Sequence, residues 1–298
     1  MGVTIKHGDN LNLMKELPDN SVDLVLCSPP YEDARDYGIG FNLRGQEWVD
    51  WAVVRYVECV RVCKGLVVWV VEGKTKDFRW SATPVLFMAD LHRSGVRLRK
   101  PPIYKRVGIP GSGGPDWWRN DYEFCVCSSK GRLPWSDNTA TGEPPKYGPG
   151  GAMSHRMKNG ERKHNPGRRS AGKTEDQTYH PPEKANPGNV IECVVGGGRI
   201  GSKLAHENEA PFPEKLVEPF IRSFCPPGGI VLDPFCGSGT TLVVADWLGR
   251  NAIGFDVRGS QVELSRRRLV ESVSAGDAGP EPQSLSLTLV DLVEKLIR

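Results

Sequence analysis

The chain has 298 residues, of which 38% are hydrophobic and 25% are charged, and its formal net charge is +3. These proportions are ordinary for a globular protein, and the length suffices for one large domain or one domain with an insertion. No apolar run reaches the roughly 20 residues of a membrane span, and residues 1–7 lack the apolar core of a signal peptide. We therefore expect a cytoplasmic protein rather than a membrane protein.

Strands and helices alternate before residue 128. The run 22–27 and the uninterrupted apolar run 66–71 predict strands, and the second is typical of a strand buried on both faces of a parallel sheet. Between them, apolar residues recur at helical spacing over 48–60. A further helical segment is predicted at 84–91, and strand-like segments around 96–107 and 122–126. This alternation predicts an α/β fold.

The segment from about 128 to 188 has a different character. Its periodicity disappears, and Gly, Pro, Asn, Ser, Lys and Arg dominate. Eleven Lys and Arg residues outnumber six Asp and Glu residues in it, so the basic surplus of the whole chain lies here. The segment is predicted to be a loop-rich insertion.

Periodic structure returns after residue 188. An apolar run ending at Asp233 predicts a buried strand that enters a Gly-rich turn, and a helix rich in Arg266, Arg267 and Arg268 is predicted to be exposed. The predicted strands cover 190–195, 229–233 and 251–256, and the predicted helices cover 213–224, 240–248 and 261–273. Beyond a Gly/Pro linker, apolar residues between 285 and 297 recur at helical spacing, which predicts a packed or dimerising helix.

The Cys residues fit a reducing compartment. Most of the eight lie in or beside apolar runs, where a free Cys behaves as a small buried hydrophobe. Cys125 and Cys127 are closer together than the Cys pairs of common zinc loops, and no second pair follows at a zinc-finger distance. We therefore expect neither a metal site nor a disulfide.

The first motif is the Gly-rich segment 233–241, directly after an apolar strand and directly before a helix. A phosphate-binding loop would need a Lys before its hydroxyl residue, and a dinucleotide fingerprint would need Gly where Leu242 stands. Asp256 ends the next strand, where a carboxylate can accept hydrogen bonds from both hydroxyls of a ribose. The alternative is a simple tight turn. The unit predicts a pocket for an adenosyl ligand without a pyrophosphate.

The second motif is the tetrapeptide 28–31, again at the end of an apolar strand. Pro29 and Pro30 have no amide donors, so the loop is predicted to present carbonyl oxygens without local partners. Ser28 adds a hydroxyl, and Tyr31 offers a ring on which a planar base can stack. These groups together suit the binding of an amino group and its ring, although such a tetrapeptide alone is more often a turn.

Together, the two motifs resemble those of the β-class amino-methyltransferases of DNA, known from restriction-modification systems and phages. The resemblance covers residues 5–38 and 203–257 and leaves the basic insertion unmatched. In that family the tetrapeptide precedes the Gly-rich loop, as here, whereas methyltransferases of glutamine and several of RNA usually show the reverse order. The resemblance implies a class I methyltransferase fold, a Rossmann-like mixed sheet with helices on both faces, with S-adenosyl-L-methionine as cofactor and DNA as partner.

The motifs and the resemblance together assign residues to roles. The catalytic residues are Ser28, Pro29, Pro30 and Tyr31. The cofactor-binding residues are Asp9, Asn10, His206, Phe212, Pro213, Glu214, Asp233, Pro234, Phe235, Gly237, Ser238, Gly239, Thr240 and Asp256. Asp9 also suits the N-cap of a helix at 11–17, and His206 by itself would be an ordinary surface histidine.

DNA recognition is assigned to the basic insertion. A duplex hides an exocyclic amine, so base flipping is implied, and Lys and Arg can contact phosphates and guanine edges. The alternative is a solvated loop. The predicted DNA-binding residues of the insertion are Arg156, Lys158, Arg162, Lys163, Arg168, Arg169 and Lys173. Arg35, soon after the tetrapeptide, is predicted to contact a phosphate. The predicted organisation is a catalytic half at 1–127, an inserted target-recognition region at 128–188, a cofactor-binding half at 189–275, and a linker with an amphipathic helix at 276–298.

The predicted reaction is direct transfer of a methyl group to the exocyclic amine. Ser28 Oγ and the Pro29 carbonyl would accept its hydrogen bonds while Tyr31 stacks on the flipped base. In the family, Ser at the first tetrapeptide position is commoner among N4-cytosine enzymes and Asp among N6-adenine enzymes, so N4-cytosine is favoured and N6-adenine remains the alternative. A further alternative is a non-catalytic DNA-binding protein. A homodimer and a cognate restriction endonuclease are the other partners to consider.

Overall fold

The computed structural model describes residues 2–32, 40–108, 115–145, 153–156, 159–165, 183–195, 203–208 and 212–274. Contacts divide the chain into two units, Met1–Asp137 with Gly188–Arg298, and Asn138–Pro187. Within the described ranges, no helix combines the length and the apolar content that a membrane crossing requires.

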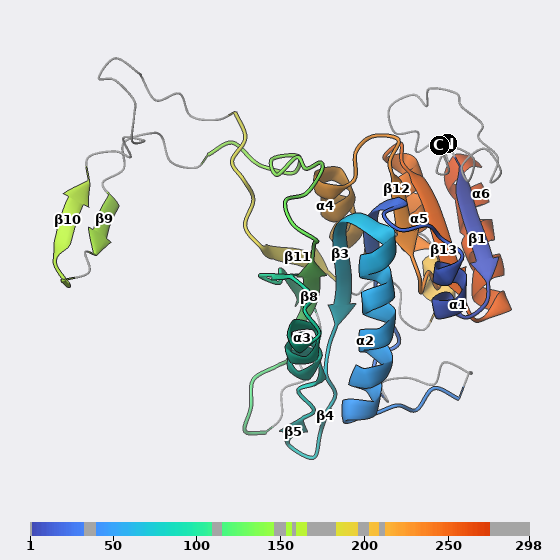
Figure 1. Cartoon of the computed structure of the whole chain (residues 1–298), viewed down its shortest axis with the longest axis horizontal. Coiled ribbons are helices and arrows are strands. Elements are labelled where there is room, and N and C mark those ends of the chain that lie inside the picture. Colours follow the sequence, from blue (N-terminus) through green and yellow to red (C-terminus); the bar gives the residue numbers. More distant parts are fainter. Residues whose placement is uncertain are drawn as a thin grey trace. The chain divides into compact units, whose positions relative to one another are not determined.

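The first unit is built on a mixed β-sheet (Figure 1). Its strands are β1 Val3–His7, β2 Val22–Cys27, β3 Cys63–Val71, β6 Leu98–Arg99, β7 Ile103–Val107, β8 Tyr122–Ser128, β11 Val190–Val194, β12 Ile230–Asp233 and β13 Asn251–Asp256. They follow the order β1, β13, β12, β2, β3, β8, β7, β11, with β6 beside β8. β8 is antiparallel to each of its neighbours, and the other neighbouring strands in this order are parallel.

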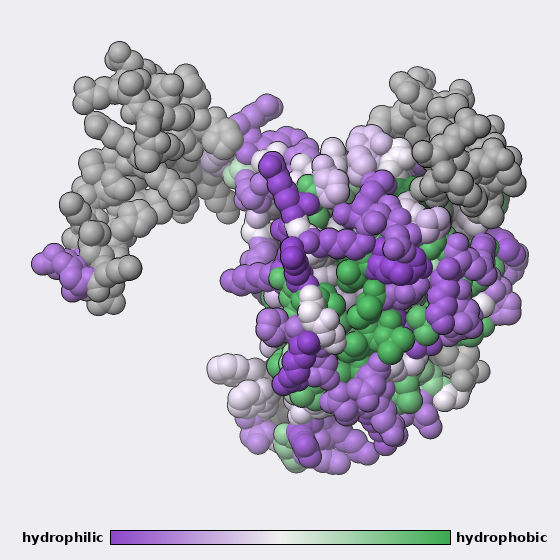
Figure 2. Space-filling model, in the orientation of Figure 1, coloured by the Kyte–Doolittle hydropathy of each residue, from purple (hydrophilic) through white to green (hydrophobic). Residues whose placement is uncertain are grey.

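Helices cover both faces of this sheet (Figure 1). They are α1 Asn10–Lys15, α2 Gly45–Val62, α3 Thr83–Arg93, α4 Glu214–Phe224, α5 Thr240–Trp247 and α6 Gly259–Ser274, with a 3-10 helix η1 Lys203–Glu207 and a small hairpin of β4 Thr75–Lys76 and β5 Arg79–Trp80. α1, α2 and α3 share one core with the sheet, and α4 and α5 share the other. Apolar colour also reaches the surface in the area of α2 (Figure 2), where Val54 and Val57 are exposed.

The residues of β2 show why two helical layers are needed. Val25 and Cys27 belong to the core beneath α1, α2 and α3, whereas Leu24 and Leu26 belong to the core beneath α4 and α5. Successive strand residues point to opposite faces of a sheet, so an apolar strand without alternation must be covered on both. The predicted α/β fold is confirmed.

β2 and β12 lie side by side at the point where the chain reverses its direction across the sheet. Leu24 pairs with Val231 and Val25 with Leu232. The chain then leaves β2 through α2 toward β3 on one side and leaves β12 through α5 toward β13 on the other. The loops that follow these two strands therefore diverge, and a ligand crevice is expected between them.

In the main sheet and α6, three features differ from the sequence predictions, and the short pairs β4–β5 and β9–β10 were not predicted either. No strand was predicted at β1, which pairs with β13 at one edge of the sheet. The single segment expected at 96–107 is two strands, because Pro101 and Pro102 separate them and prolines cannot donate to a ladder. Arg268 was placed on an exposed helix but is only 2% exposed, because its guanidinium turns inward toward the loop before α5.

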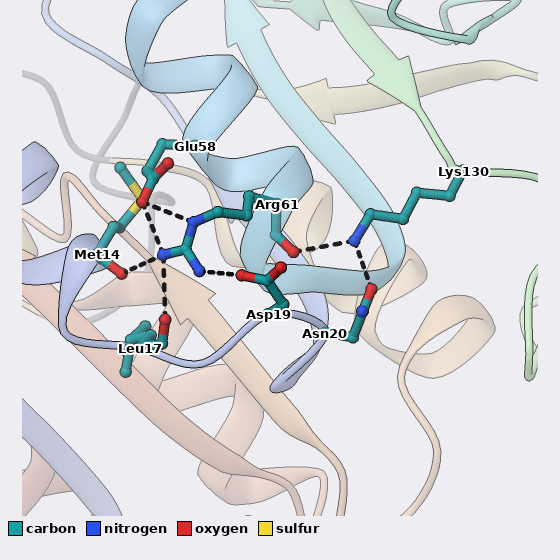
Figure 3. Close-up of polar contacts among 7 residues, drawn as sticks. All are labelled: Met14, Leu17, Asp19, Asn20, Glu58, Arg61 and Lys130. Atoms are coloured by element: carbon teal, nitrogen blue, oxygen red, sulfur yellow. Dashed lines mark hydrogen bonds and ion pairs between the residues drawn. The ribbon is translucent and has the colours of Figure 1, made fainter.

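Arg61, near the C-terminal end of α2, joins that helix to the α1–β2 connection (Figure 3). Its guanidinium donates to the carbonyl oxygens of Met14 and Leu17 at 2.9 and 3.0 Å, and it also contacts Asp19 and Glu58. Lys130 donates to the Arg61 carbonyl at 2.9 Å. This cluster fixes the start of β2 without approaching the carboxyl end of that strand.

The described part of the second unit contains an antiparallel pair, β9 Met153–Arg156 and β10 Arg162–Asn165. This unit covers most of the predicted insertion, whereas residues 128–137 belong to the first unit. Its assignment to DNA recognition stays a prediction.

Candidate active site

The loops after β2 and β12 line a single cavity of about 700 Å³, a size typical of small-molecule sites. Of the predicted site residues, it is lined by Asp9, Asn10, Ser28, Pro29, Pro30, Tyr31, Phe212, Pro213, Asp233, Pro234, Phe235, Gly237, Ser238, Thr240 and Asp256. The structure adds Gly8, Phe41, Trp51, Arg55, Glu72, Gly73, Tyr104, Arg106, Asn120, Glu123, Val195, Asn208, Cys236, Val257 and Arg258. The two motifs, far apart in the chain, thus share one cavity.

Three predicted cofactor residues do not line the cavity. His206 is exposed on η1, and Asn208, two residues later, reaches the cavity instead. Glu214 accepts a hydrogen bond from Arg268 at 3.1 Å. Gly239 has φ +79°, and a Cβ atom there would lie 2.8 Å from Ser265 Oγ, so Gly239 serves the shape of the loop.

The structure describes no side chain of the predicted DNA-binding residues. Arg35, Lys158, Arg168, Arg169 and Lys173 lie outside the described residues. For Arg156, Arg162 and Lys163, the structure describes only the strand backbone of β9 and β10.

The Gly-rich loop is held against the end of β13 and against α6. The Gly237 amide donates to Asp256 Oδ2 at 2.9 Å, and Ser265 Oγ donates to the Gly237 carbonyl at 2.7 Å. Gly237 has φ +49°, a left-handed conformation that favours glycine. These contacts fix the turn that brings the loop close to the cavity.

Arg268 of α6 completes the support of this loop. Its Nη1 donates to the Ser238 carbonyl at 2.9 Å, to Ser238 Oγ at 3.1 Å and to Thr240 Oγ1 at 2.9 Å. Gln261, Ser265 and Arg268 are all buried and recur at helical spacing, so they occupy one face of α6. A helical-wheel placement could have found Arg268 from the sequence, whereas the Arg-rich composition hid it.

Two buried carboxylates flank the loop. Asp233 Oδ1 accepts from the Phe235 amide at 3.0 Å, and Asp256 Oδ1 accepts from the Arg258 amide at 2.8 Å. Burial, with the neighbouring Asp256 charge, raises the pKa of Asp233 to about 7. A carboxylate can accept about four hydrogen bonds, so both groups retain acceptor capacity toward the cavity.

A second wall joins α1 to the Gly-rich loop. Asn10 Nδ2 donates to the Pro234 carbonyl at 3.0 Å, and Arg55 of α2 donates to Asn10 Oδ1 and Asp9 Oδ2, each at 3.0 Å. The Arg55 guanidinium also lies 4.5 Å from the centroid of the Trp51 ring. Asp9 is in addition the N-cap of α1, since it accepts from the Asn12 amide. Capping and cavity lining, posed as alternatives, are both observed for Asp9.

The tetrapeptide loop is fixed by one of its own carbonyl groups. Trp48 Nε1 donates to the Pro30 carbonyl at 2.8 Å, which corrects the expectation that the loop carbonyls have no partner. Among the described residues, no hydrogen bond reaches the Pro29 carbonyl. Ser28 Oγ lies 3.3 Å from the Val70 carbonyl of neighbouring β3. Ser28 and Pro29, which carry this hydroxyl and this carbonyl, both line the cavity.

Two carboxylates that the sequence did not reveal lie in the same cavity. Tyr31 Oη donates to Glu123 Oε2 at 2.6 Å and lies 3.2 Å from Ser28 Oγ. Glu123 Oε1 pairs with Arg106 Nη1 at 3.3 Å. Burial, together with the Glu123 charge, raises the pKa of Glu72, whose Oε2 is buried and has no hydrogen-bond partner within the described chain.

Glu32 follows the tetrapeptide directly and anchors it. Its carboxylate accepts from the amides of Gly45 and Lys74 at 2.9 and 3.1 Å and from Thr83 Oγ1 at 2.9 Å. Burial opposes ionisation of Glu32, but these hydrogen bonds and one from Ser81 outweigh it and lower its pKa. The loop is therefore tied to the starts of α2 and α3 and to the end of β3.

The residues of the cavity fit an adenosyl cofactor. Trp51 and Phe235 have ring centroids 5.7 Å apart and both line the wall beside Asn10, where a flat purine can pack. Asp256 can accept from ribose hydroxyls, and Asp233 can pair with a cationic group when ionised. Among the described residues, no cluster of His, Cys, Asp and Glu could hold a metal ion, and all eight Cys are free and buried.

Known proteins match the chain over most of its length. Residues 22–267 match the N6/N4 family model described as DNA methylase. The chain is 31% identical over 270 residues to the orphan methyltransferase M.BamHII of Bacillus amyloliquefaciens, which covers 86% of this chain and 92% of that protein. It is 26% identical over 279 residues to the type II methyltransferase M.ScaI of Streptomyces caespitosus, covering 90% and 81%. It is also 26% identical over 271 residues to the DNA adenine methyltransferase YhdJ of Escherichia coli, covering 89% and 82%.

Solved structures show the same fold. The cytosine-N4-specific PvuII DNA methyltransferase superimposes with a TM-score of 0.65 at 19% identity and covers 94% of each chain. A Thermus thermophilus protein in complex with S-adenosyl-L-methionine superimposes with a TM-score of 0.54 at 19% identity, covering 91% of this chain and 96% of its own.

Proposed function

Given that the chain belongs to the N6/N4 DNA methylase family and is an S-adenosylmethionine-dependent DNA amino-methyltransferase, we propose that it methylates N4 of cytosine. The observation that carries this proposal is Ser28, a neutral hydroxyl at the cavity wall in the first tetrapeptide position. N6 of adenine is the second candidate, because the relative YhdJ is named a DNA adenine methyltransferase.

The target amine is oriented by acceptors of the tetrapeptide loop. Its lone pair is delocalised into the ring, and acceptors around its two hydrogens favour a more tetrahedral nitrogen with a freer lone pair. Ser28 Oγ and the Pro29 carbonyl supply these acceptors, because the Pro30 carbonyl already accepts a hydrogen bond from Trp48. These groups contribute orientation and electrostatic stabilisation, and no covalent intermediate with the enzyme forms.

The cofactor half of the cavity follows from the carboxylates and rings already described. When bound, S-adenosylmethionine supplies an electrophilic methyl group on a sulfonium. Asp256 would hold the ribose hydroxyls, an ionised Asp233 would attract the cationic end, and Phe212 and Pro213 would pack along the methionine portion. Trp51, Phe235 and Asn10 would hold the adenine ring.

Methylation of the amine releases one proton, and Glu72 is the group that accepts it. Its Oε2 has no partner within the described residues, and its raised pKa makes it a stronger base than an ordinary carboxylate. Glu72 directly follows β3, and Ser28 directly follows β2, the neighbouring parallel strand. The N–H bond breaks, the proton moves to Glu72 Oε2, and the neutral acid later loses it to solvent.

DNA binding by the basic segment 128–188 remains part of the proposal. Its Lys and Arg residues would contact phosphates, with the target base flipped into the cavity. A homodimer and a cognate restriction endonuclease are further partners that the family makes reasonable.

Mass spectrometry of nucleosides tests the proposed reaction. DNA is incubated with S-adenosylmethionine and either the wild-type protein or Ser28→Ala, which should bind cofactor but transfer methyl groups much more slowly. N4-methylcytosine is the expected product. N6-methyladenine would overturn the choice of base, and the absence of any methylated base with folded, cofactor-binding protein would overturn the proposed function.

A further inference from the structure

Two adjacent tryptophans stand in solvent between β7 and β8. Trp117 and Trp118 are 76% and 85% exposed. In contrast, Trp48 and Trp69 are buried in the core. An indole ring carries a large apolar area, and large apolar groups exposed side by side mark a surface that a partner covers.

The connection that carries this pair borders the active-site cavity. Arg106 holds its end, because the Arg106 amide donates to the Asp121 carbonyl at 2.7 Å and Nη2 donates to the Asn120 carbonyl at 2.9 Å. Asn120 and Arg106 both line the cavity. Trp118 is thus two residues from a cavity-lining residue whose backbone is fixed.

We propose that Trp117 and Trp118 form a platform on which a base of the substrate DNA stacks, beside the nucleotide that enters the cavity. This inference rests on the proposed function, because a flipped nucleotide leaves its neighbours without a stacking partner. Aromatic rings replace that partner irrespective of sequence, since every base has a π-face.

The geometry of the pair selects the outer ring face. The ring centroids are 5.9 Å apart and the planes are inclined by 34°. A base inserted between the rings would need about twice the ~3.4 Å spacing of stacked bases, which this separation does not provide. The base therefore stacks on the outward face of the pair.

The surroundings favour DNA over a second copy of this chain. Trp118 is two residues from Asn120, which lines the cavity that receives the target base, so the substrate DNA must approach this segment. Arg119, next in the chain, has a partly exposed guanidinium that can approach a phosphate beside the stacked base.

Duplex-binding titrations test the platform. The probe is a fluorescent duplex taken from DNA that the wild-type protein methylates, with S-adenosylhomocysteine present. We compare wild type, the Trp117→Ala/Trp118→Ala double variant, and Trp117→Phe/Trp118→Phe. The alanine pair should weaken binding roughly 10- to 100-fold and the phenylalanine pair should regain most of it. The slope of affinity against salt should stay unchanged, because stacking releases no counterions.

Matched measurements separate the alternatives. Val54→Ala, an exposed apolar change on α2, should leave DNA affinity unchanged, and cofactor affinity should be unchanged in every variant. Equal affinity of the alanine pair and wild type would overturn the platform while leaving methyl transfer intact. A dimer of the wild type that becomes a monomer in the alanine pair would instead make the pair a protein interface. If the wild type methylated no DNA, the proposed function would fail. The DNA affinities of wild type and the alanine pair, measured on a duplex of arbitrary sequence, would still test the platform.

Discussion

The hydroxyl of Tyr31 donates a hydrogen bond to Glu123 Oε2 at 2.6 Å, across 92 positions of the chain. The sequence predicted only a stacking role for this ring, in which the hydroxyl would be dispensable. Because Tyr31 Oη also lies 3.2 Å from Ser28 Oγ, its hydroxyl links the proposed amine acceptor to a buried carboxylate.

Tyr31→Phe should therefore separate stacking from chemistry. Removal of the hydroxyl takes one hydrogen bond from Glu123 and the contact with Ser28, a cost of about 1–3 kcal/mol, and we expect it chiefly in the rate of methyl transfer. DNA affinity should persist because the ring remains. Single-turnover kinetics on an unmethylated duplex that contains the target site would measure the rate of methyl transfer and the DNA affinity. In a cycle with Glu123→Gln, the two losses should not add. If Tyr31→Phe transferred methyl groups at the wild-type rate, Tyr31 would act by stacking alone.

Asp233 predicts the pH dependence of cofactor binding. Its pKa of about 7 in the folded protein lies above the ordinary value of 3.8. An ionised Asp233 attracts the cationic cofactor and a neutral one does not, so affinity should rise as the pH passes through 7 and then level off. Calorimetry from about pH 5.5 to 8.5 would show this rise in the wild type and a flat profile in Asp233→Asn. A pH-independent wild-type affinity would contradict the role.

The same raised pKa fixes the sign of the stability effect. Between pH 3.8 and about 7 the folded state keeps a proton on Asp233 that the unfolded state has lost. The contribution of this group to stability therefore falls as the pH rises through that window and stays constant above it. Asp233→Asn should remove that fall from the profile of unfolding free energy measured without cofactor.

Arg268→Ala should weaken cofactor binding although its side chain does not line the cavity. It removes the donor that Ser238 and Thr240 share, and hydrogen bonds from a charged group are worth about 1.5–3 kcal/mol each. We expect at least a tenfold loss of affinity and a lower melting temperature, with Arg268→Lys intermediate because an ammonium lacks the guanidinium fork. Arg266→Ala, an exposed change on the same helix, is the control. Equal cofactor affinities for the two folded alanine variants would refute the role of Arg268 in supporting the Gly-rich loop.

Replacement of Arg168 and Arg169 together by Ala tests the basic segment. The loss of two phosphate contacts should reduce the slope of log affinity against log salt by about two and spare cofactor binding. Fluorescence anisotropy across a salt series measures the slope. If it does not change, the DNA-binding surface lies elsewhere on the protein.

Arg61→Ala should affect stability alone. The change removes the guanidinium hydrogen bonds to the Met14 and Leu17 carbonyls, and we expect a loss of about 1–2 kcal/mol in the free energy of unfolding, because the site is partly exposed. Denaturant unfolding would measure it. Methyl transfer by the folded fraction should be normal, and a changed rate would connect this end of β2 to the active site.

Local patterns in the sequence were enough to predict most elements and both motifs. The uninterrupted apolar runs form β2, β3 and β12, because a strand buried on both faces needs apolar residues at every position. The segments with apolar residues at helical spacing form α2 and α5, because a helix buries one stripe of its surface. The tetrapeptide and the Gly-rich loop could be placed at strand ends for the same reason. The edge strand β1 escaped, since its half-buried residues lack an uninterrupted apolar run.

Tertiary structure decided which groups meet. The contact of Asn10 with Pro234 and that of Tyr31 with Glu123 depend on the order of strands in the sheet, which no local period encodes. Glu72 and Glu123 read in the sequence as ordinary acids at strand ends, and Arg268 as one of three exposed arginines. The two glutamates became parts of the site because parallel pairing of β2 with β3 and β12, and antiparallel pairing of β3 with β8, bring their segments to one edge. Arg268 supports the Gly-rich loop because the buried face of α6 packs against it. Backbone hydrogen bonds alone do not determine which strands pair. Burial of the apolar faces in the core selects the strand order and register, and this order brings the site residues together.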